Sequence, residues 1–482
     1  MRTRSTTDSP ATTSADTIAV GVFEDEGIAH DLPGNELAAL LDAGEARRSF
    51  KHLAVWHHDG RRFVLVGLGA RDAFTAERAR VAAAVVAGRA RELGTRTLCW
   101  EVPHHVSEDV VGGLVEGTLL AAYRFDRFKS SAGDATGGLD ELVLSAHHDV
   151  ADAVERSVVL AEAANRVRDL QNTPPNEMTP TALAEHARGL QGVAVEVEGR
   201  EQIEARGMGA FAAVARGSYQ EPALITLAYE PPTFAGPHLV FVGKAVTFDS
   251  GGISIKPGAN MADMKFDMGG GAAVIEAVGA IARLGLPVRV TGVVGATENM
   301  PSGRSMRPGD IVRAMNGTTI EIINTDCEGR LVLSDCLAHA VALGAERIAE
   351  LSTLTGAMSN FMGSTYAGLM ATDDAWAGEV LAAGERTGEI SWRLPLHEEY
   401  GDLIKGAYGD IVNLNEPRKA GGITAGHFLT HFTGDVPFAH LDIAGVADGL
   451  GRAYAPKQAS GWGVRMLVAL AEAQVSGDSG SA

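Results

Sequence analysis

The sequence predicts a two-domain α/β protein, and three observations support this fold class. The chain has 482 residues, more than the roughly 250–300 residues that a single hydrophobic core usually serves. Short apolar runs typical of buried strands alternate with alanine-rich stretches whose apolar residues recur at helical spacing. This alternation implies βαβ units and a mainly parallel sheet. No run of eighteen or more apolar residues occurs, so no membrane-spanning helix is predicted.

The N-terminal domain is predicted over residues 17–148. Before it, residues 1–16 are rich in serine and threonine and lack an apolar core, so we expect a disordered leader and not a signal peptide. Gly67 and Gly69 follow a strand, and we interpret them as a turn in preference to a phosphate-binding loop. The expected strands are 17–23, 53–57, 63–68 and 97–102, and the expected helices are 75–93 and 110–123.

A connecting helix is predicted over residues 149–171, because its apolar residues recur at helical spacing. Pro174 and Pro175 follow it. Proline has no amide hydrogen and restricts the residue before it, so the helix is expected to end ahead of this pair.

The second domain is predicted over residues 172–475. It opens with a helix whose N-cap is Thr179 and whose first residue is Pro180. Residues 476–482 are expected to form a flexible tail. The other predicted strands are 193–198, 223–229, 239–242, 288–296, 318–323, 347–351 and 438–443, and the helices are 200–205, 272–284, 331–343 and 461–472.

Composition excludes several classes of partner. A net charge of −20 argues against nucleic acid, and the basic aromatic segment 123–129 is interpreted as a helix exit. Three sparse cysteines form no disulfide framework, which fits a reducing cytoplasm, so a cytoplasmic protein with no membrane partner is expected. None of the histidines shows the spacing of zinc ligands, so exposed or core positions are expected for them. The adjacent pairs are His57-His58, His104-His105 and His147-His148.

Acidic residues follow the predicted strands of the second domain. In open α/β sheets ligands bind beyond the carboxyl ends of the strands, so we expect these side chains to meet there. Two lysines, Lys244 and Lys256, occur in the same loops. The carboxylates are those of Asp249, Asp267, Asp326 and Glu328.

Local patterns predict how two of these loops run. Gly243 is expected to end the strand 239–242. In an extended segment residues two apart face the same side, so Asp326 and Glu328 are expected to converge while Cys327 faces away.

Four carboxylates in one place repel one another unless protons or cations neutralise them. Two divalent cations cancel four negative charges. Oxygen-rich ligation suits magnesium, manganese and zinc in paired sites, where the ions lie roughly 3.5–4 Å apart. Lys244 is either a salt-bridge partner, as an ammonium, or a metal ligand, as a neutral amine.

Three segments of the second domain are distinctive: VGKAVTFDSGGISIK at 242–256, NMADMKFDM at 260–268 and NTDCEGRL at 324–331. Together with the segments 351–356 and 440–445, they resemble the leucyl aminopeptidase family of two-metal exopeptidases. The resemblance implies a macro-like N-terminal α/β domain, a catalytic α/β domain with a mixed central sheet flanked by helices, and a homohexamer. One letter departs from the family pattern, because Cys327 stands where alanine is common, and we expect activity to be retained.

The resemblance also implies the metal ligands. Asp249 and Glu328 would bridge two divalent ions, manganese or zinc. Asp326 would complete the exchangeable site, and Lys244 with Asp267 would complete the tighter one.

The catalytic and pocket residues follow from the same resemblance. Lys256 would polarise the scissile carbonyl, and Arg330 would hold a bicarbonate ion that accepts a proton from water. Met264, Thr353 and Gly356 match positions that line the pocket for the first residue of the peptide. Peptides with leucine-like N-terminal residues are the expected substrates.

Other classes of function remain as alternatives. A two-metal phosphohydrolase could use the same carboxylates, but the histidine ligands and phosphate-binding cluster typical of that class are not found. No Gly-x-Ser-x-Gly segment occurs, which argues against a serine hydrolase. A DNA-binding or regulatory scaffold with secondary peptidase activity remains an alternative, because some members of the resembled family bind DNA. The presence of all the implied catalytic residues argues against it. The predicted function is therefore that of a metal-dependent aminopeptidase.

Overall fold

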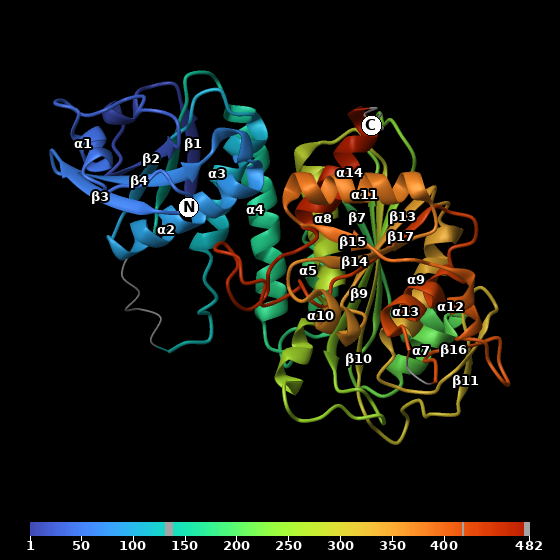
Figure 1. Ribbon diagram of the computed structural model, residues 1–482. Coiled ribbons are helices and arrows are strands. Elements are labelled where there is room, and N and C mark those ends of the chain that lie inside the picture. The colour runs from blue at the N-terminus through green and yellow to red at the C-terminus, as the bar shows by residue number, and fades with distance from the viewer. Residues whose placement is uncertain (131–137, 417–418, 477–482) are drawn as a thin grey trace. The chain divides into compact units, whose positions relative to one another are not determined.

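The structure is a computed structural model that describes residues 1–130, 138–416 and 419–476 (Figure 1). It divides into two compact units. The smaller unit contains residues 1–165 and 451–456, and the larger unit contains the rest of the described chain. The division falls within α4 (Ala151–Asn172). Both units combine a sheet with helices, so the predicted two-domain α/β class is confirmed.

The smaller unit is built on a six-stranded sheet in the order β1-β6-β5-β2-β4-β3. All neighbours are parallel except β3, which runs antiparallel to β4. The strands are β1 (Arg2–Thr6), β2 (Thr17–Phe23), β3 (Leu53–His58), β4 (Arg61–Gly69), β5 (Thr97–Glu101) and β6 (Glu141–Ser145), and the helices are α1 (Glu36–Asp42), α2 (Ala76–Glu92) and α3 (Glu108–Ala122).

The expectation of a disordered leader over residues 1–16 is wrong. Residues Arg2–Thr6 form β1, which pairs in parallel with β6 at the edge of the sheet. The Arg4 Nε donates to the Glu141 Oε1 at 2.9 Å. An edge strand needs no continuous apolar stretch, because its backbone groups bond on one side only and its side chains are partly exposed. The composition of this segment, rich in serine and threonine, therefore did not indicate that it forms a strand.

The larger unit contains an eight-stranded sheet in the order β15-β14-β17-β13-β9-β10-β8-β7. The central strands β17, β13, β9 and β10 are parallel, whereas β14, β8 and β7 each pair antiparallel with a neighbour. The predicted mixed central sheet is confirmed. Its strands are β7 (Ala194–Glu198), β8 (Ala223–Tyr229), β9 (Leu239–Asp249), β10 (Val290–Asn299), β13 (Arg347–Ser352), β14 (Ala367–Ala371), β15 (Ser391–Arg393) and β17 (Phe438–Asp442).

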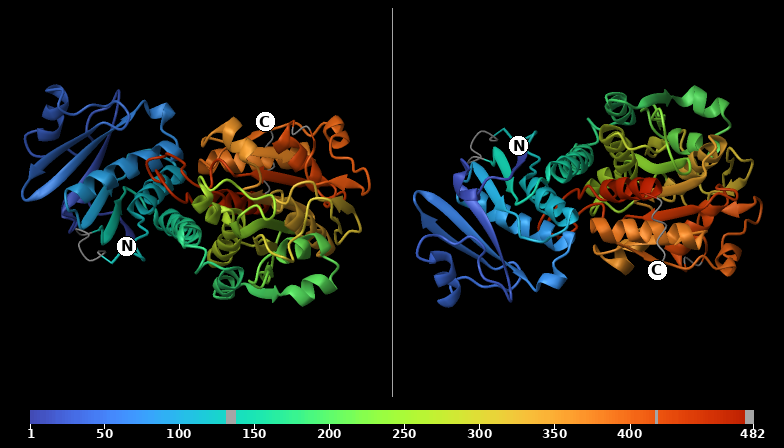
Figure 2. Two further views of the ribbon diagram at one scale, coloured as in Figure 1. Left: turned by 90° about the horizontal axis from the view of Figure 1, so that it is seen from below. Right: turned by 90° about the horizontal axis from the view of Figure 1, so that it is seen from above.

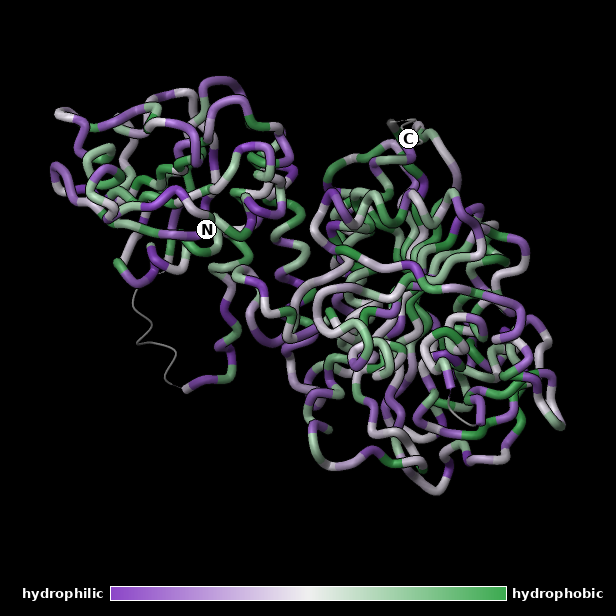
Figure 3. Tube along the Cα trace, in the orientation of Figure 1, coloured by the Kyte–Doolittle hydropathy of each residue, from purple (hydrophilic) through white to green (hydrophobic). Residues whose placement is uncertain are grey.

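Helices cover both faces of this sheet. On one face lie α8, α11 and α14, and on the other lie α7, α9 and α13 (Figure 1 and Figure 2). The strands between them are mostly hydrophobic (Figure 3), as expected for a sheet buried on both sides. The helices are α7 (Gly209–Ala215), α8 (Gly269–Leu284), α9 (Gly329–Ala342), α11 (Asp374–Thr387), α13 (Gly421–Thr430) and α14 (Val464–Ser476).

Shorter elements complete the larger unit. The predicted N-cap of α5 is confirmed, since the Thr179 side chain accepts a hydrogen bond from the Ala182 amide and Pro180 opens the helix. None of the helices in the described ranges is both long and apolar enough to cross a membrane. Of the expected tail, only Ser476 lies within the described residues, where it ends α14. The elements are α5 (Pro180–Arg188), α6 (Arg200–Ala205), α10 (Gly356–Met362), α12 (Glu398–Asp402) and a three-stranded sheet of β11 (Ile311–Arg313), β12 (Thr319–Glu321) and β16 (Ile411–Val412).

Gly243 does not end a strand, contrary to expectation, because β9 continues to Asp249. The glycine serves close packing instead. A Cβ atom on Gly243 would lie 2.6 Å from the Cα of Gly271 in the first turn of α8. A Cβ atom on Gly270 would lie 2.0 Å from the carbonyl oxygen of Leu351 in β13. Glycines on both sides thus let α8 begin directly against the sheet.

Substitution of Gly270 tests this packing. Gly270→Ala is expected to lower the free energy of unfolding by about 1–3 kcal/mol, because the added methyl group would overlap the Leu351 carbonyl. The matched control is Gly378→Ala in α11, where a Cβ atom has no neighbour within 4 Å. The control should raise stability by about 0.5–1 kcal/mol, as alanine does in a helix interior. Denaturant midpoints measure both effects. If Gly270→Ala has the same midpoint as the unsubstituted protein, α8 does not depend on this close contact with β13.

Candidate metal centre

The site begins at the carboxyl ends of β9 and β10. Asp249 ends β9, and Asn299, its partner in the parallel ladder, ends β10. The register shifts just before this pair and leaves one extra residue in β9, Thr247. Lys244 and Asp249 are five residues apart, a spacing that places side chains on opposite faces of a regular strand. The extra residue changes the alternation, so both side chains can reach the same place.

Three carboxylates converge at this place. Carboxylate oxygens of Asp249, Asp326 and Glu328 lie within 4.8 Å of one another. Asp267 joins them through Lys244, whose Nζ lies 2.7 Å from the Asp267 Oδ2 and 2.8 Å from the Glu328 Oε1. The structure therefore brings together all five residues that the sequence suggested as ligands.

Asp326 and Glu328 converge by a different route from the one expected. The segment is not extended, since Asp326 lies in a turn and Glu328 has helical angles, φ −74° and ψ −36°, at the N-cap of α9. Gly329 permits this start, because a Cβ atom there would lie 2.6 Å from the Lys244 Cε. The half-buried Cys327 lies between the two acids, and burial raises the pKa of its thiol, which favours the protonated form.

The second lysine contacts the other side of the cluster. The Lys256 Nζ lies 2.8 Å from the Asp249 Oδ2 and 2.5 Å from the Asp326 Oδ1. The side chain of Lys256 is 21% exposed, whereas that of Lys244 is 3% exposed. Lys256 is therefore the lysine that a bound molecule can reach.

Burial and neighbouring charges together set the pKa values in the cluster. Burial raises the pKa values of Asp267 and Glu328, and neighbouring negative charge adds to the effect. Burial alone would lower the pKa of Lys244, but Asp267, Glu328 and Asp249 together outweigh it and raise that pKa. The raised pKa favours the ammonium form of Lys244, and the lysine becomes a neutral ligand only if metal ions replace its proton.

The cluster fits divalent cations. Four carboxylates face two lysines, so positive charge is in deficit. In the described chain, the buried oxygens Asp267 Oδ2, Asp326 Oδ1 and Glu328 Oε1 accept no well-directed hydrogen bond, although lysines lie at ion-pair distance. Such oxygens are suited to metal coordination, and an oxygen-rich set with one amine suits magnesium, manganese or zinc.

Two neighbours orient the carboxylates. The Asn299 Nδ2 donates to the Asp249 Oδ1 at 2.8 Å and to the Thr325 carbonyl at 3.0 Å. Sequence reasoning did not single out Asn299, although its position just after the predicted strand 288–296 was the available signal. The Thr353 Oγ1 donates to the Asp267 Oδ1 at 2.7 Å, so this residue, expected in the pocket, also holds a carboxylate.

The remaining suggested residues surround the cluster. Met264 lies in a 3-10 helix, and its carbonyl accepts the Asp267 amide at 3.5 Å. Gly356 begins α10, and a Cβ atom there would meet no atom within 4 Å. Arg330 is buried in the first turn of α9, where its Nη1 donates to the Asn413 carbonyl at 2.7 Å. Its buried Nε has no hydrogen-bond partner among the described residues.

Comparisons with known proteins identify the family of this chain. Residues 165–468 match the catalytic domain of the cytosol aminopeptidase family, and residues 20–132 match its N-terminal domain. A probable cytosol aminopeptidase of Roseiflexus castenholzii is 41% identical over 97% of this chain and 98% of its own.

Two solved structures are similar over nearly the whole chain. The bottromycin maturation enzyme BotP in complex with Mn has a TM-score of 0.87 and 35% identity, covering 95% of this chain and 99% of that one. A mutant of tomato leucine aminopeptidase has a TM-score of 0.88 and 30% identity, covering 98% of this chain and 96% of that one. The chain therefore belongs to the cytosol aminopeptidase family and is a metal-dependent aminopeptidase.

Proposed function

We propose that this aminopeptidase uses two divalent ions per chain, manganese or zinc, to release leucine-like apolar residues from the N-termini of peptides. The observation that carries the proposal is the group of buried carboxylate oxygens without directed hydrogen bonds. When bound, such ions lower the pKa of water from 15.7 to about 7 and so supply a nucleophile at neutral pH. The residues that would hold them are Lys244, Asp249, Asp267, Asp326 and Glu328.

Lys256 would act on the carbonyl of the bond to be cleaved. Burial alone would lower the pKa of Lys256, but Asp249 and Glu328 outweigh it and raise that pKa, which keeps the amine charged. A fixed positive charge stabilises the negative charge that develops on the carbonyl oxygen. The carboxylate of Asp267 would attract the free amine of the peptide, which would explain cleavage at N-termini.

Arg330 would hold bicarbonate, the proton acceptor that the family resemblance implies. The support is its buried Nε–H group, which has no hydrogen-bond partner among the described residues. Hydrogen bonds between a guanidinium and a carboxylate-like anion are charge-assisted and can be bidentate, so a small planar anion fits such a group.

The pocket for the first residue would be lined by Met264, Thr353 and Gly356. Gly356 borders open space, which suits a branched apolar side chain. Preference among such side chains is typically limited to about 1–3 kcal/mol per methylene group. We also propose a homohexamer, which the family resemblance supports, and a cytoplasmic location, which the names of the relatives support.

Hydrolysis of leucine p-nitroanilide tests the function directly. Metal-stripped protein should be inactive, and Mn²⁺ or Zn²⁺ should restore cleavage more effectively than Mg²⁺. The N-acetylated substrate, which lacks the free amine, should not be cleaved. If folded protein cleaves neither substrate with any of these ions, the proposed peptidase is rejected in favour of a scaffold role.

Lys256→Ala is expected to lower kcat by about 10²–10³-fold with a smaller change in KM, because it removes charge that acts on the developing oxyanion. Steady-state kinetics at saturating metal measure the split between kcat and KM. The control is Lys405→Ala, since Lys405 is exposed and pairs with the exposed Asp402. A normal kcat in Lys256→Ala would remove this lysine from the catalytic set.

Thr353→Val is expected to raise the metal concentration needed for half-maximal activity about 10–100-fold, as losses of hydrogen bonds to metal ligands do. The variant deletes the 2.7 Å hydrogen bond to Asp267, and activity at saturating metal should largely recover. The matched control is Thr355→Val, which deletes a 2.7 Å bond to Asp442, a carboxylate outside the ligand set. Metal titrations compare the two, and equal shifts would show that orientation of Asp267 is not the cause.

A further inference from the structure

Three histidines converge in the smaller unit. His30, His104 and His147 follow β2, β5 and β6, three neighbouring strands of the sheet. These strands are parallel, so the three loops leave the same edge. After β2 the chain forms β3 and β4 on one side of it and then crosses to β5 on the other. Ligands of open α/β sheets bind at such a switch in strand order.

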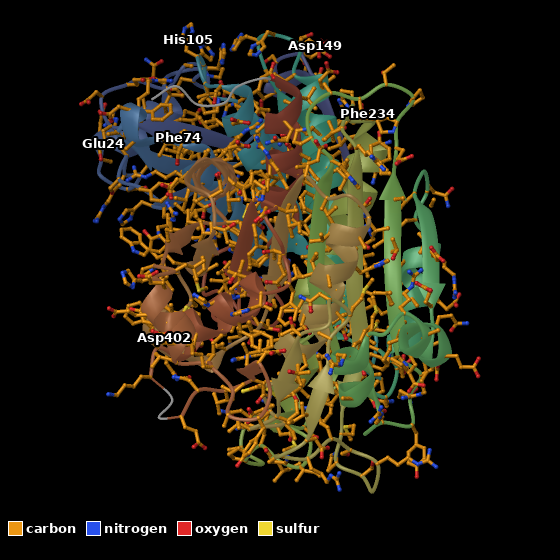
Figure 4. The ribbon with its side chains drawn as sticks, turned by 90° about the vertical axis from the view of Figure 1, so that its right-hand side faces the viewer. Glu24, Phe74, His105, Asp149, Phe234 and Asp402 are labelled. Carbon is orange, nitrogen blue, oxygen red and sulfur yellow. The ribbon has the colours of Figure 1, made fainter. Side chains whose placement is uncertain are left out.

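The rings lie close enough to share one ion. One nitrogen of each of the three histidines lies within 4.8 Å of the others. The ring centroids of His104 and His147 are 3.9 Å apart, and those of His30 and His147 are 5.2 Å apart. The adjacent His105 is separate, since its exposed ring points outward (Figure 4) and lies 6.2 Å from that of His104.

The hydrogen bonds of these histidines leave ring nitrogens available to bind a metal. The His30 Nδ1 lies 2.5 Å from the Oε1 of Glu101, the last residue of β5. A carboxylate only accepts, so the His30 Nδ1 carries the hydrogen and the lone pair resides on Nε2. This carboxylate-histidine pairing is the one that orients metal ligands in proteins. The Nε2 of His104 is buried and has no hydrogen-bond partner in the described chain.

The surroundings of His104 favour its neutral form. Burial lowers the pKa of His104, and the neighbouring His147 and His30 lower it further. Only the neutral ring can bind a metal. Arg71 lies nearby, where it donates to the His104 carbonyl at 2.8 Å, but its guanidinium is paired with Glu26 at 2.7 Å. The charge of Arg71 is therefore offset within the same group of loops.

We propose that His30, His104 and His147 form a second metal site, for a borderline transition-metal cation such as Zn²⁺, with Glu101 orienting His30. Three imidazoles suit zinc, whereas the carboxylates of the peptidase site suit harder ions as well. Zinc–nitrogen bonds of about 2.0–2.1 Å require small ring movements from the present separations. His30 and His147 are exposed and line a cavity of 270 Å³, so an ion can enter from solvent and keep a water as the fourth ligand.

The site would join the loop after β2 to the ends of β5 and β6. Zinc would then stabilise the smaller unit by mass action, since the unfolded chain does not hold the three rings together. This inference is independent of the proposed peptidase function, because it uses none of the residues of that site.

Zinc binding to the full-length protein tests the site. Chelator-treated protein is dialysed against micromolar Zn²⁺, and bound zinc per chain is measured by elemental analysis. His147→Ala should bind one ion fewer than the unsubstituted protein, and its aminopeptidase activity with Mn²⁺ should be unchanged. His104→Ala should show the same loss. The matched control is His148→Ala, which removes the adjacent exposed histidine and should keep the full zinc content.

Two results would overturn the proposal. One is equal zinc content in the unsubstituted protein and both variants of the cluster. The other is an equal loss in His148→Ala, which would indicate adventitious binding to surface histidines. Circular dichroism spectra verify that each variant is folded. His147 is exposed, so its replacement by alanine removes no core packing.

Discussion

Repulsion among four carboxylates at one edge of the larger sheet is the constraint on which the site depends. Asp249, Asp267 and Glu328 are buried, where charge is costly unless it is compensated. Lys244 and Lys256 compensate part of it through four ion pairs at 2.5–2.8 Å. The uncompensated negative charge favours the binding of cations. The same repulsion that destabilises the cluster without metal therefore gives the cluster its affinity for metal.

Close backbone packing makes room for this cluster. Gly270 and Gly271 bring the first turn of α8 against β13 and β9, and Gly329 lets α9 begin beside the Lys244 side chain. Each position lacks the space for a Cβ atom. The helices therefore fix the loops that carry Asp267 and Glu328 within reach of β9, and the rigidity of the sheet is passed to the ligands.

Both units gather polar side chains at the carboxyl ends of parallel strands, but the side chains are of different types. In the larger unit the parallel strand β9 ends in the carboxylate of Asp249, and its neighbour β10 ends in Asn299, which orients that carboxylate. In the smaller unit β2, β5 and β6 are followed by His30, His104 and His147. Carboxylates suit hard and borderline cations, and imidazoles suit borderline ones. Parallel strands gather side chains from distant parts of the chain at one edge in both cases.

The sequence by itself determined the α/β class, the alternation of strands and helices, and the residue types of the proposed peptidase site, because these depend on local periodicity and on contiguous segments. Only the tertiary structure decided how the side chains meet. Several features arise from pairing between distant segments. They are the extra residue at Thr247, the turn before Glu328, the edge strand β1 and the convergence of His30, His104 and His147. Local sequence patterns do not reveal such pairing, because it depends on packing and register across the whole sheet.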